Sequence, residues 1–564
     1  MLKQGGILLK TNMRSIASLI LAAAFALSAC SNGNGGVDDA GSQQPNETQP
    51  SNAAEASNGT QASSEPVTVT VFAPQTEGIQ KLDENRFSKH LEERLNIKFD
   101  WEITPYNVFG DKKMLLLASG DYPSVILDAG MSKADLIKYG KQGVLLPLND
   151  LIDRYAPNIK QAMEEIDYLK PAMTAPDGII YALPKVNECK HCTFGHRMWI
   201  NTAWLEKLGL AMPTTTDEFY EVLKAFKEQD PNGNGQPDEI PLTTSYDMWG
   251  GGLTPFLMNA FIYEDPATRL SIRDGEVIMS AAQPEWKEGL AYLRKLYSEG
   301  LVDQGAFTQN NDAVRQLGAK PEPVVGAVSY ALISSMIGVN DETPLHKDYD
   351  VVPPLKGPAG VQLSYYDVGA GGGQFVITNK ATEEQQIAAI RLADYLFSEE
   401  GTLMTTWGFE EGGWIKAKEG SLDYNGNQAK YEDITKNRPQ GTLDETWWQL
   451  GTMKMTNAMR ESFVAPEDPL GNGGYEYRLW LAAKKYEPYA KPEVVYPKDV
   501  FYDPDDATFI AQIQKSIQDY VNTNAAQFIT GNRDLEKDWE SYLEGFQGMK
   551  LDQYLEVMQS AIAE

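Results

Sequence analysis

The sequence predicts an α/β protein with at least two folded domains, and three observations support this prediction. The chain has 564 residues, which is too long for one ordinary hydrophobic core. Strand-like runs alternate with helical patterns from Val67 onward, which is typical of a parallel α/β sheet. The same alternation restarts after about Pro184 and again after Gly373.

The first 29 residues have the layout of an export signal and are not expected to belong to the folded body. Lys3, Lys10 and Arg14 precede an apolar run over residues 16–27, which is too short to span a bilayer comfortably. Leu-Ser-Ala then leads directly to Cys30, an arrangement that resembles the bacterial lipobox. That resemblance implies a mature chain that begins at Cys30 with a lipid such as palmitate and is anchored at the extracellular face of the cytoplasmic membrane. A plain secretory signal with an incidental cysteine is the alternative.

Residues 30–66 are predicted to form a disordered tether. They include no aromatic residue, no Lys or Arg, and one branched aliphatic residue, Val37, so they cannot bury enough apolar area to offset chain entropy. The formal net charge of the whole chain is −30, which disfavours nucleic acid and anionic lipid headgroups as partners. We therefore expect membrane association through the lipid anchor only.

The folded body is expected to begin at Val67 with VTVTVFA, an alternating β-rich run. Helical spacing follows around Phe87, and the next strands are expected at IKFDWEI from Ile97 and SVILDAG from Ser124. Three later helices carry start signals, namely the capping boxes Thr215–Glu218 and Thr382–Gln385 and a proline at a first helical position, Pro284.

Four stretches carry a resemblance to a known family. They are MPTTTDEFYEVLKAFKEQDPNGNGQPDEIPL, YDVVPPLKGPAG, GGGQFVITNKATEEQQIAAIRLADYLFSEEG and FITGNRDLEKDWESYLEGFQGMKLDQYLEVMQ. In this order they resemble the extracellular solute-binding proteins (family 1) of bacterial ABC importers, in particular LipO-type lipoproteins and alginate-oligosaccharide-binding periplasmic proteins. The resemblance implies a two-lobed, periplasmic-binding-protein-like (type II) fold with an interlobe cleft. Its first lobe would be residues 67–184 plus 358–405, and its second lobe residues 185–357 plus 406–564.

The same resemblance implies a monomeric binding protein that captures an oligosaccharide between its lobes and delivers it to the permease subunits of an ABC transporter. The alternative from another class is a surface-anchored polysaccharide lyase or glycoside hydrolase. We expect no enzyme, because GxSxG, HExxH, Walker A and Rossmann glycine patterns are all missing from the sequence, and only four histidines are present.

The loop DPNGNGQPDEIP suggests a structural calcium site. Alternate oxygen-bearing residues followed by a glycine at the sixth position match the start of an EF-hand loop, and hard oxygen ligands favour calcium over zinc or copper. The twelfth position is Pro241 instead of the usual Glu, but the resembled alginate-binding proteins close their calcium loop at the ninth and tenth positions. The candidate ligands are Asp230, Asn232, Asn234, Gln236, Asp238 and Glu239. A plain Asn/Gly turn with solvated acids is the alternative.

The motif Cys189-Lys-His-Cys192 has three possible readings, which are a local disulfide, free thiols and a metal site. In an oxidising exterior the disulfide is favoured. A redox-active CxxC would begin a helix, whereas this one follows an extended LPKVNE stretch. A single CxxC with a histidine is a weak zinc signal without a second pair.

The ligand-binding candidates come from two arguments. Ligands gather beyond the carboxyl ends of strands in doubly wound sheets, which points to Gln75 and Asp128. Sugar rings stack on aromatic planes while carboxylates and amides take their hydroxyls, which points to residues in glycine-rich loops, namely Trp249, Tyr365, Asp367, Trp407 and Trp414. Trp447 and Trp448 are a further possibility. Few cations accompany these aromatics, so a neutral glycan is favoured over a polyuronate.

Overall fold

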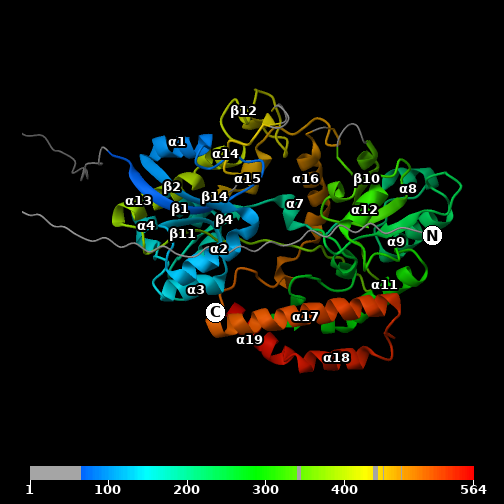
Figure 1. Ribbon diagram of the computed structural model, residues 1–564. Coiled ribbons are helices and arrows are strands. Elements are labelled where there is room, and N and C mark those ends of the chain that lie inside the picture. The colour runs from blue at the N-terminus through cyan, green and yellow to red at the C-terminus, as the bar shows by residue number, and fades with distance from the viewer. Residues whose placement is uncertain are drawn as a thin grey trace, which may run out of the picture. The chain divides into compact units, whose positions relative to one another are not determined.

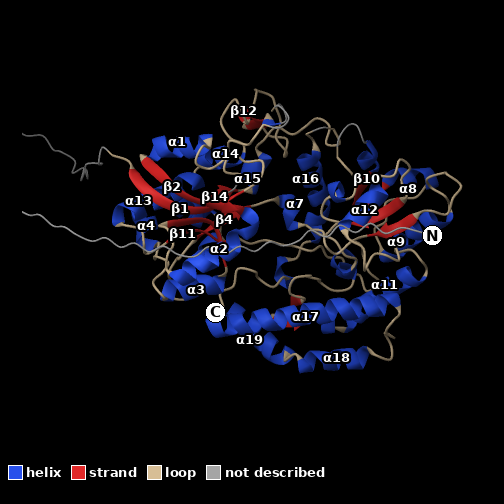
Figure 2. Ribbon diagram, in the orientation of Figure 1, coloured by secondary structure: helices blue, strands red, loops and turns tan. Residues whose placement is uncertain are grey.

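The computed structural model describes residues 65–339, 344–435, 438, 442–448, 450–471, 473–563 (Figure 1). The expected signal peptide, the lipidation site Cys30 and the expected tether up to residue 64 lie outside the described residues. The described residues belong to one compact unit. Its two larger sheets, of six and four strands, are separate, and helices surround each (Figure 2).

The first sheet has six strands in the order β14-β4-β11-β3-β1-β2. Its strands are β1 Val67–Gln75, β2 Ile97–Pro105, β3 Val125–Met131, β4 Leu183–Asn187, β11 Gly371–Ile377 and β14 Met453–Met455. β1 pairs in parallel with β2 and β3, while β11 runs antiparallel to both β3 and β4. The helices of this part are α1 Arg86–Leu95, α2 Tyr106–Ser119, α3 Lys133–Lys141, α4 Asn149–Tyr155, α5 Pro157–Glu165, α6 Leu169–Met173, α13 Glu383–Phe397 and α14 Glu399–Thr406. We call this part the first lobe.

Both faces of the first sheet are buried, as is usual for a largely parallel sheet covered by helices on both sides. Val71 and Leu127 belong to the core cluster that includes α1, α4, α5 and α13, whereas Phe72 and Ile126 belong to the cluster that includes α2 and α3. Because neighbouring residues of one strand point to opposite faces, the β-rich runs VTVTVFA and SVILDAG supply both cores.

The second sheet has four strands in the order β10-β5-β9-β6, and we call it and its helices the second lobe. Its strands are β5 Met198–Asn201, β6 Ile240–Thr243, β9 Val325–Ser329 and β10 Tyr349–Val352, with a separate hairpin of β7 Leu270–Arg273 and β8 Glu276–Met279. The helices are α7 Lys190–Thr193, α8 Thr202–Leu208, α9 Thr216–Glu228, α10 Thr254–Leu257, α11 Pro284–Ser298, α12 Asn311–Gly318, α16 Tyr475–Tyr486, α17 Pro504–Thr530, α18 Trp539–Gly548 and α19 Leu551–Ala563. A small hairpin of β12 Trp414–Lys416 and β13 Tyr431–Asp433 and the helix α15 Asn457–Glu461 have a small core of their own.

The expected strands and helices are confirmed, and so are the helix start signals. Thr215 Oγ1 accepts a hydrogen bond from Glu218 N at 3.1 Å, and the carboxylate of Glu218 accepts one in return from Thr215 N at 3.2 Å. Thr382 and Gln385 form the same reciprocal pair at the start of α13. Each such cap contributes about 1 kcal/mol to stability. Pro284 is the first residue of α11, where its missing N–H is not needed.

Within the described residues, the chain crosses between the two sheets three times. The crossings are residues 188–197 after β4, residues 353–370 before β11 and residues 456–474 between β14 and α16. The third crossing differs from the expected division, which gave all of residues 406–564 to the second lobe. β14 pairs in parallel with β4, so residues 453–455 belong to the first sheet. A three-residue strand carries too little local pattern to reveal its partner.

Two further features concern the helices. α17 packs against α11 of the second lobe and also reaches α3 of the first. Among the described residues, none of the helices combines the length and the apolar character needed to cross a membrane.

Candidate functional site

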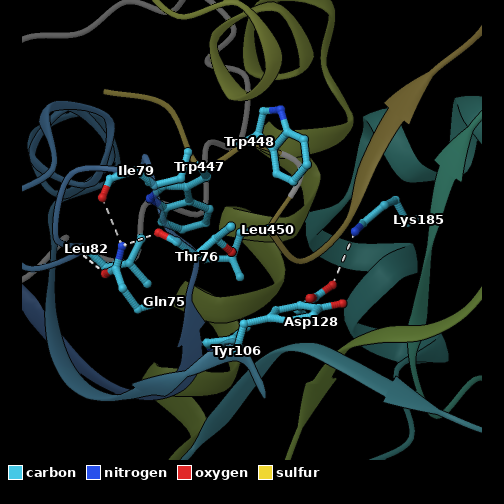
Figure 3. Close-up of a pocket in the computed structure, with 11 residues that line it drawn as sticks. Gln75, Thr76, Ile79, Leu82, Tyr106, Asp128, Lys185, Trp447, Trp448 and Leu450 are labelled. Atoms are coloured by element: carbon cyan, nitrogen blue, oxygen red, sulfur yellow. Dashed lines mark hydrogen bonds and ion pairs between the residues drawn. The ribbon is translucent and has the colours of Figure 1, made fainter. Parts of the chain in front are cut away.

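A cavity of about 270 Å³ opens at the carboxyl ends of β1, β2 and β3 (Figure 3). We call it the first cavity. Its lining residues are Pro74, Gln75, Thr76, Ile79, Leu82, Tyr106, Asp128, Lys185, Trp447, Trp448 and Leu450. The position agrees with the rule that ligands of open α/β sheets gather beyond the strand ends. Gln75 and Asp128, which the same rule nominated from the sequence, both line this cavity.

The side chain of Gln75 is occupied by its own loop. Its Nε2 donates to the carbonyls of Thr76 and Ile79 at 3.2 and 3.1 Å, and its Oε1 accepts from Leu82 N at 3.2 Å. Gln75 therefore shapes the cavity wall by fixing the turn after β1.

Asp128 presents a carboxylate to the cavity. Its Oδ1 lies 3.2 Å from Lys185 Nζ, and both side chains are partly exposed. The φ angle of Asp128 is 50°, a left-handed conformation that non-glycine residues rarely adopt. Such strained residues occur preferentially where a side chain must be aimed at a functional site.

Two exposed aromatic rings line the first cavity. Tyr106, the first residue of α2, is 62% exposed, and Trp448 is 56% exposed. Figure 3 shows the Trp448 ring at the top of the view and Tyr106 at the bottom. Trp448 also has a positive φ of 42°. Its neighbour Trp447 is buried instead, and the Trp447 Nε1 donates to Ser88 Oγ at 2.9 Å.

A second cavity, of about 560 Å³, shares Trp448 with the first. It lies between the segment from α14 to α15 and the helices α7 and α16. Its lining aromatic residues are His191, Trp407, Tyr424, Trp448, Phe463, Tyr475 and Trp480, and its ionisable residues are Lys190, Glu432, Asp433, Arg438, Asp444, Arg460, Glu461 and Glu476. The Trp407 ring stacks on Phe463 at 4.3 Å between centroids, and Tyr424 packs edge-on against Trp480 at 5.7 Å.

The described Lys and Arg residues that line the two cavities all have partners. Lys190 pairs with Glu487 at 2.9 Å, Arg438 with Asp444 at 3.5 Å and Lys185 with Asp128 at 3.2 Å. Arg460 donates from Nε to the carbonyl of Glu188 at 2.6 Å. Burial, together with the charges of Arg197 and Arg460, lowers the pKa of His191 to about 3, so this ring is neutral at pH 7. Among the described residues, the lining therefore offers no unpaired positive charge to a ligand.

Four other sequence candidates lie outside the first cavity, and Trp407 lines the second. Trp249, 46% exposed, lies against the crossing segment, because a Cβ at Gly195 would come within 3.0 Å of its indole nitrogen. Asp367 N donates to Thr193 O of the same segment at 2.9 Å.

The remaining candidates have mainly protein partners. The hydroxyl of Tyr365 donates to Asp367 at 3.1 Å and accepts from Lys498 at 3.0 Å. Lys498 also lies 2.8 Å from the other carboxylate oxygen of Asp367. Trp414 is buried in the small core beside Tyr431 and donates to the carbonyl of Gly408 at 2.9 Å, so it has little ring surface left for a ligand.

The candidate calcium loop is folded by hydrogen bonds among its own residues. Asp230 accepts hydrogen bonds from the three backbone N–H groups of residues 233–235 at 2.9–3.1 Å. The amides of Asn232 and Asn234 both donate to Asp238 Oδ1, at 3.0 and 3.1 Å. Gly235 takes a left-handed φ of 72° at the sharp bend.

One oxygen of this loop fits a cation in particular. Glu239 Oε1 is buried and has no hydrogen-bond partner in the protein. Burial raises the pKa of Glu239, and the negative charges of Asp230 and Asp238 add to this effect. A divalent ion bound here would pair with this buried oxygen and would offset the repulsion between Glu239 and its acidic neighbours. The donor set of carboxylates and amide oxygens fits calcium, with Asn232, Asn234 and the Gln236 carbonyl as the uncharged members.

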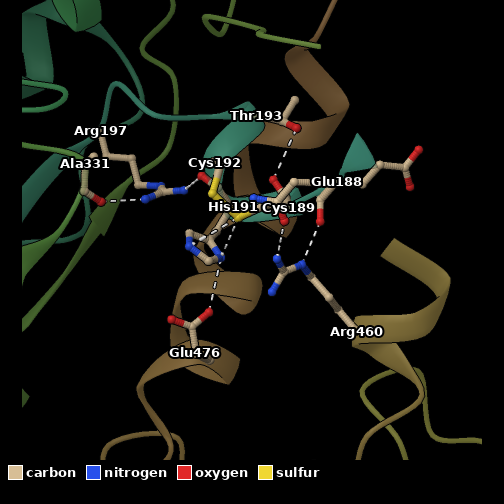
Figure 4. The surroundings of a disulfide bond; sticks show 10 residues. Glu188, Cys189, His191, Cys192, Thr193, Arg197, Ala331, Arg460 and Glu476 are labelled. Atoms are coloured by element: carbon tan, nitrogen blue, oxygen red, sulfur yellow. Dashed lines mark hydrogen bonds and ion pairs between the residues drawn. A yellow bond between two sulfur atoms is a disulfide. The ribbon is translucent and has the colours of Figure 1, made fainter. Parts of the chain in front are cut away.

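Cys189 and Cys192 form a disulfide (Figure 4). Contrary to the sequence expectation, the motif does begin a helix, because Cys189 is the N-cap of the four-residue helix α7. Among the described residues, Cys189, His191 and Cys192 are the one group of at least three His, Cys, Asp or Glu ligand atoms within 4.8 Å of one another. Both sulfurs are used by the disulfide, so they cannot act as thiolate ligands. The disulfide closes a loop whose His191 and Lys190 line the second cavity.

Sequence reasoning did not identify Tyr106, Lys185 or the Tyr424–Trp480 pair. Tyr106 follows the second strand directly, so the strand-end rule applied to β2 would have found it. Lys185 lies on β4, and Tyr424 and Trp480 meet only through the third crossing. No local signal marks those three residues.

Comparisons with known proteins agree on one family. Residues 73–403 match the family described as bacterial extracellular solute-binding protein. The chain is 30% identical over 486 residues to the fructooligosaccharide ABC transporter substrate-binding protein FusA of Streptococcus pneumoniae, covering 85% of this chain and 86% of FusA. It is also 30% identical over 378 residues to lipoprotein LipO of Bacillus subtilis, covering 65% of this chain and 71% of LipO.

Solved structures of FusA are similar as well. FusA in complex with kestose superposes with a TM-score of 0.68 at 28% identity, covering 87% of this chain and 98% of FusA. An EF-hand mutant of FusA in complex with fructo-nystose gives a TM-score of 0.67 at 28% identity, with the same coverage. These likenesses and the two-sheet architecture confirm the two-lobed α/β solute-binding fold.

Proposed function

We propose, since this chain belongs to the family of bacterial extracellular solute-binding proteins, that it is the oligosaccharide-binding component of an ABC importer. FusA, which matches most of the chain, is named for fructooligosaccharides and has a structure with kestose. The observation that carries the proposal is the pair of cavities that share Trp448, with exposed aromatic rings and paired charges in their walls.

Each component of the first cavity suits one part of a sugar. The rings of Tyr106 and Trp448 can stack on the apolar C–H faces of a pyranose or furanose ring. The carboxylate of Asp128 can accept hydrogen bonds from hydroxyls, and Lys185 Nζ can donate to them, because both groups are partly exposed at the cavity wall. The first cavity is smaller than the roughly 300–1,000 Å³ usual for ligand sites. A ligand that continues past Trp448 into the second cavity would have enough room, which supports an oligosaccharide over a single sugar.

The charge of the lining supports a neutral glycan. A polyuronate brings one carboxylate per sugar, and burying each of them requires an opposing cation. Lys185, Lys190, Arg438 and Arg460 are already engaged by carboxylates, carbonyls or amides of the protein. A ligand carboxylate would have to displace one of these partners, and the free energy lost with that partner would exceed the free energy gained from the new ion pair.

The ligand is expected to leave unaltered. The relatives named above are transporter substrate-binding proteins, and the lyase or hydrolase alternative has no support among them. The check is to incubate the protein with the glycans it binds and to assay new reducing ends and unsaturated products. Turnover in that assay would overturn the binding function.

Calcium at residues 230–239 would be structural in this proposal, because the loop follows α9 on the second lobe and contributes no residue to either cavity. A relative whose structure is described as an EF-hand mutant supports a cation there. Attachment to the membrane through a lipidated Cys30 and a tether is the remaining part of the proposal. Cys30→Ser should release the protein from cells into the medium, as immunoblots of cell and medium fractions would show.

Calorimetry on the mature chain tests the function directly. We expect micromolar or tighter binding of a neutral oligosaccharide, such as a fructooligosaccharide, and no binding of an oligogalacturonate of equal length. Tyr106→Ala should weaken binding about tenfold, because it removes one stacking surface. Val108→Ala is the matched control, since Val108 is exposed on the same helix but does not line the cavity. Equal affinities for acidic and neutral chains would refute the neutral-glycan assignment.

A further inference from the structure

β3 contains a bulge at the point where it meets the first cavity. In the antiparallel ladder, Leu127 pairs with Phe375 and Met131 pairs with Gly373. Four steps along β3 therefore match two steps along β11, so two extra residues are accommodated between Leu127 and Met131. Bulges of this kind bend a strand and redirect a side chain, and they are common beside functional sites.

The bulge brings strained backbone to the cavity. Asp128 has a φ of 50° and Gly130 a φ of 53°, on either side of the buried Ala129. Glycine adopts this conformation freely, but at Asp128 it costs about 1 kcal/mol. The surrounding structure must therefore hold Asp128 in place.

Lys113 supplies that support from behind the cavity. It is a residue of α2 that is only 8% exposed, and its Nζ donates a hydrogen bond to the carbonyl of Ala129. A bulge takes such a carbonyl out of the regular ladder, and a buried carbonyl without a partner is costly. Burial lowers the pKa of Lys113, whereas the negative charges of Asp135 and Asp128 raise it and favour the ammonium form.

We propose that Lys113 is a positioning residue for the ligand site, which fixes the 128–130 bulge so that the Asp128 carboxylate is aimed into the first cavity and toward Lys185. This inference rests on the proposed function. Lys113 itself does not line the cavity, so its effect on a ligand passes through Asp128.

The test is a double-mutant cycle on the mature chain, read by calorimetry with the neutral oligosaccharide that the wild type binds. Lys113→Met should lower affinity about tenfold, because the carbonyl of Ala129 loses its donor and the bulge relaxes. Lys112→Met is the matched control, since Lys112 is only half-buried on the same helix and pairs with Glu102 at 2.9 Å. That variant should bind within twofold of the wild type. In an Asp128→Asn background, Lys113→Met should change affinity less than twofold, because the carboxylate it positions is gone.

A ligand-free measurement separates this proposal from the proposed function. Hydrogen exchange of the amides of residues 128–130 should be about tenfold faster in Lys113→Met than in Lys112→Met. If the wild type binds no glycan, the function fails, but the exchange experiment still decides whether Lys113 holds the bulge. If Lys113→Met does not fold, Lys113→Leu, which also removes the N–H donor, takes its place in the cycle. The proposal would be overturned if the Lys113 variant bound with wild-type affinity. It would also be overturned if the losses of affinity caused by the Lys113 substitution and by Asp128→Asn were fully additive in the double mutant.

Discussion

Replacing Glu239 of the 230–239 loop by Gln should change the melting temperature in opposite directions with and without calcium. In EDTA, Glu239→Gln should melt at or above the wild-type temperature. Burial and two acidic neighbours raise the pKa of Glu239, so its ionised form destabilises the calcium-free fold. A group whose folded pKa is raised loses stability as pH rises through that value, so the ionised form of Glu239 is the destabilising one.

With calcium the order should reverse. An ion at a hundred times its dissociation constant stabilises the wild type by about 2.7 kcal/mol. Spread over a lobe of roughly 250 residues, that free energy raises the melting temperature on the order of 5 °C. Glu239→Gln loses a charged ligand and should show little of this increase. The increase for the wild type should also shrink from pH 7 to pH 4.5, because protons compete for Glu239.

Scanning calorimetry at fixed calcium or EDTA is the assay, and the chain offers its own control. Asp423 begins a similar Asp-x-Asn-x-Asn turn and accepts backbone N–H groups at 2.9 Å, but the sequence provides no carboxylate to close a shell there. Asp423→Asn should therefore keep the full response to calcium. Identical wild-type melts in calcium and EDTA would refute the site, and loss of the response in the Asp423 variant would place it elsewhere.

Three further predictions concern buried and exposed rings and the disulfide. Trp448→Ala should weaken glycan binding about tenfold with a small change in melting temperature, because the Trp448 ring is exposed. Trp447→Ala should destabilise the fold by about 3–5 kcal/mol, because the Trp447 ring is buried. Binding calorimetry and thermal melts of both variants test this pair. Burial lowers the pKa of His191 to about 3 and that of His196 to about 4, both below the usual 6.5. Both neutral rings therefore stabilise the fold above pH 6.5, and the free energy of unfolding should fall as the pH drops from 6.5 toward 4. Melting temperatures that are unchanged between pH 7 and pH 5 would contradict this. Replacing both cysteines of the 189–192 disulfide by serine should cost about 2 kcal/mol, as expected for so short a loop, and unfolding in denaturant with and without a reductant measures it.

The sequence predicted the secondary structure of the first lobe well because its signals are local. Alternating runs such as VTVTVFA and the capping box at Thr382 are complete within a few residues, and the structure contains them where expected. The strand-end rule also placed Gln75 and Asp128 at the first cavity. It gave no hint that Asp128 is strained, because the bulge depends on pairing with β11, which lies more than 240 residues later in the chain.

The aromatic candidates show where local reasoning stops. Trp407 and Trp414 occupy the same glycine-rich stretch, yet Trp407 lines the second cavity and Trp414 is buried in the small core. Which ring faces a cavity depends on the β12–β13 hairpin and on Phe463, which packs against Trp407. The role of Trp448 depends on the return of the chain to β4, through a pairing of only three residues. Neither contact leaves a periodic pattern in the sequence.

The two cavities differ in a way that predicts how ligand length controls the lobes. The first cavity is lined by residues of the first sheet, its loops and the segment before β14, so lobe movement leaves it largely unchanged. The second cavity has walls from α16 of the second lobe and from the α14–α15 segment, so movement of the lobes must alter it.

A ligand shifts a conformational equilibrium only through contacts that differ between the two states. A disaccharide confined to the first cavity should therefore bind without closing the lobes, whereas a longer chain that reaches Trp480 should close them. Small-angle X-ray scattering measures this as a smaller radius of gyration with the longer glycan only, and Trp480→Ala should abolish the contraction while the disaccharide still binds. Equal contraction with both ligands would show that the second cavity has no part in closure.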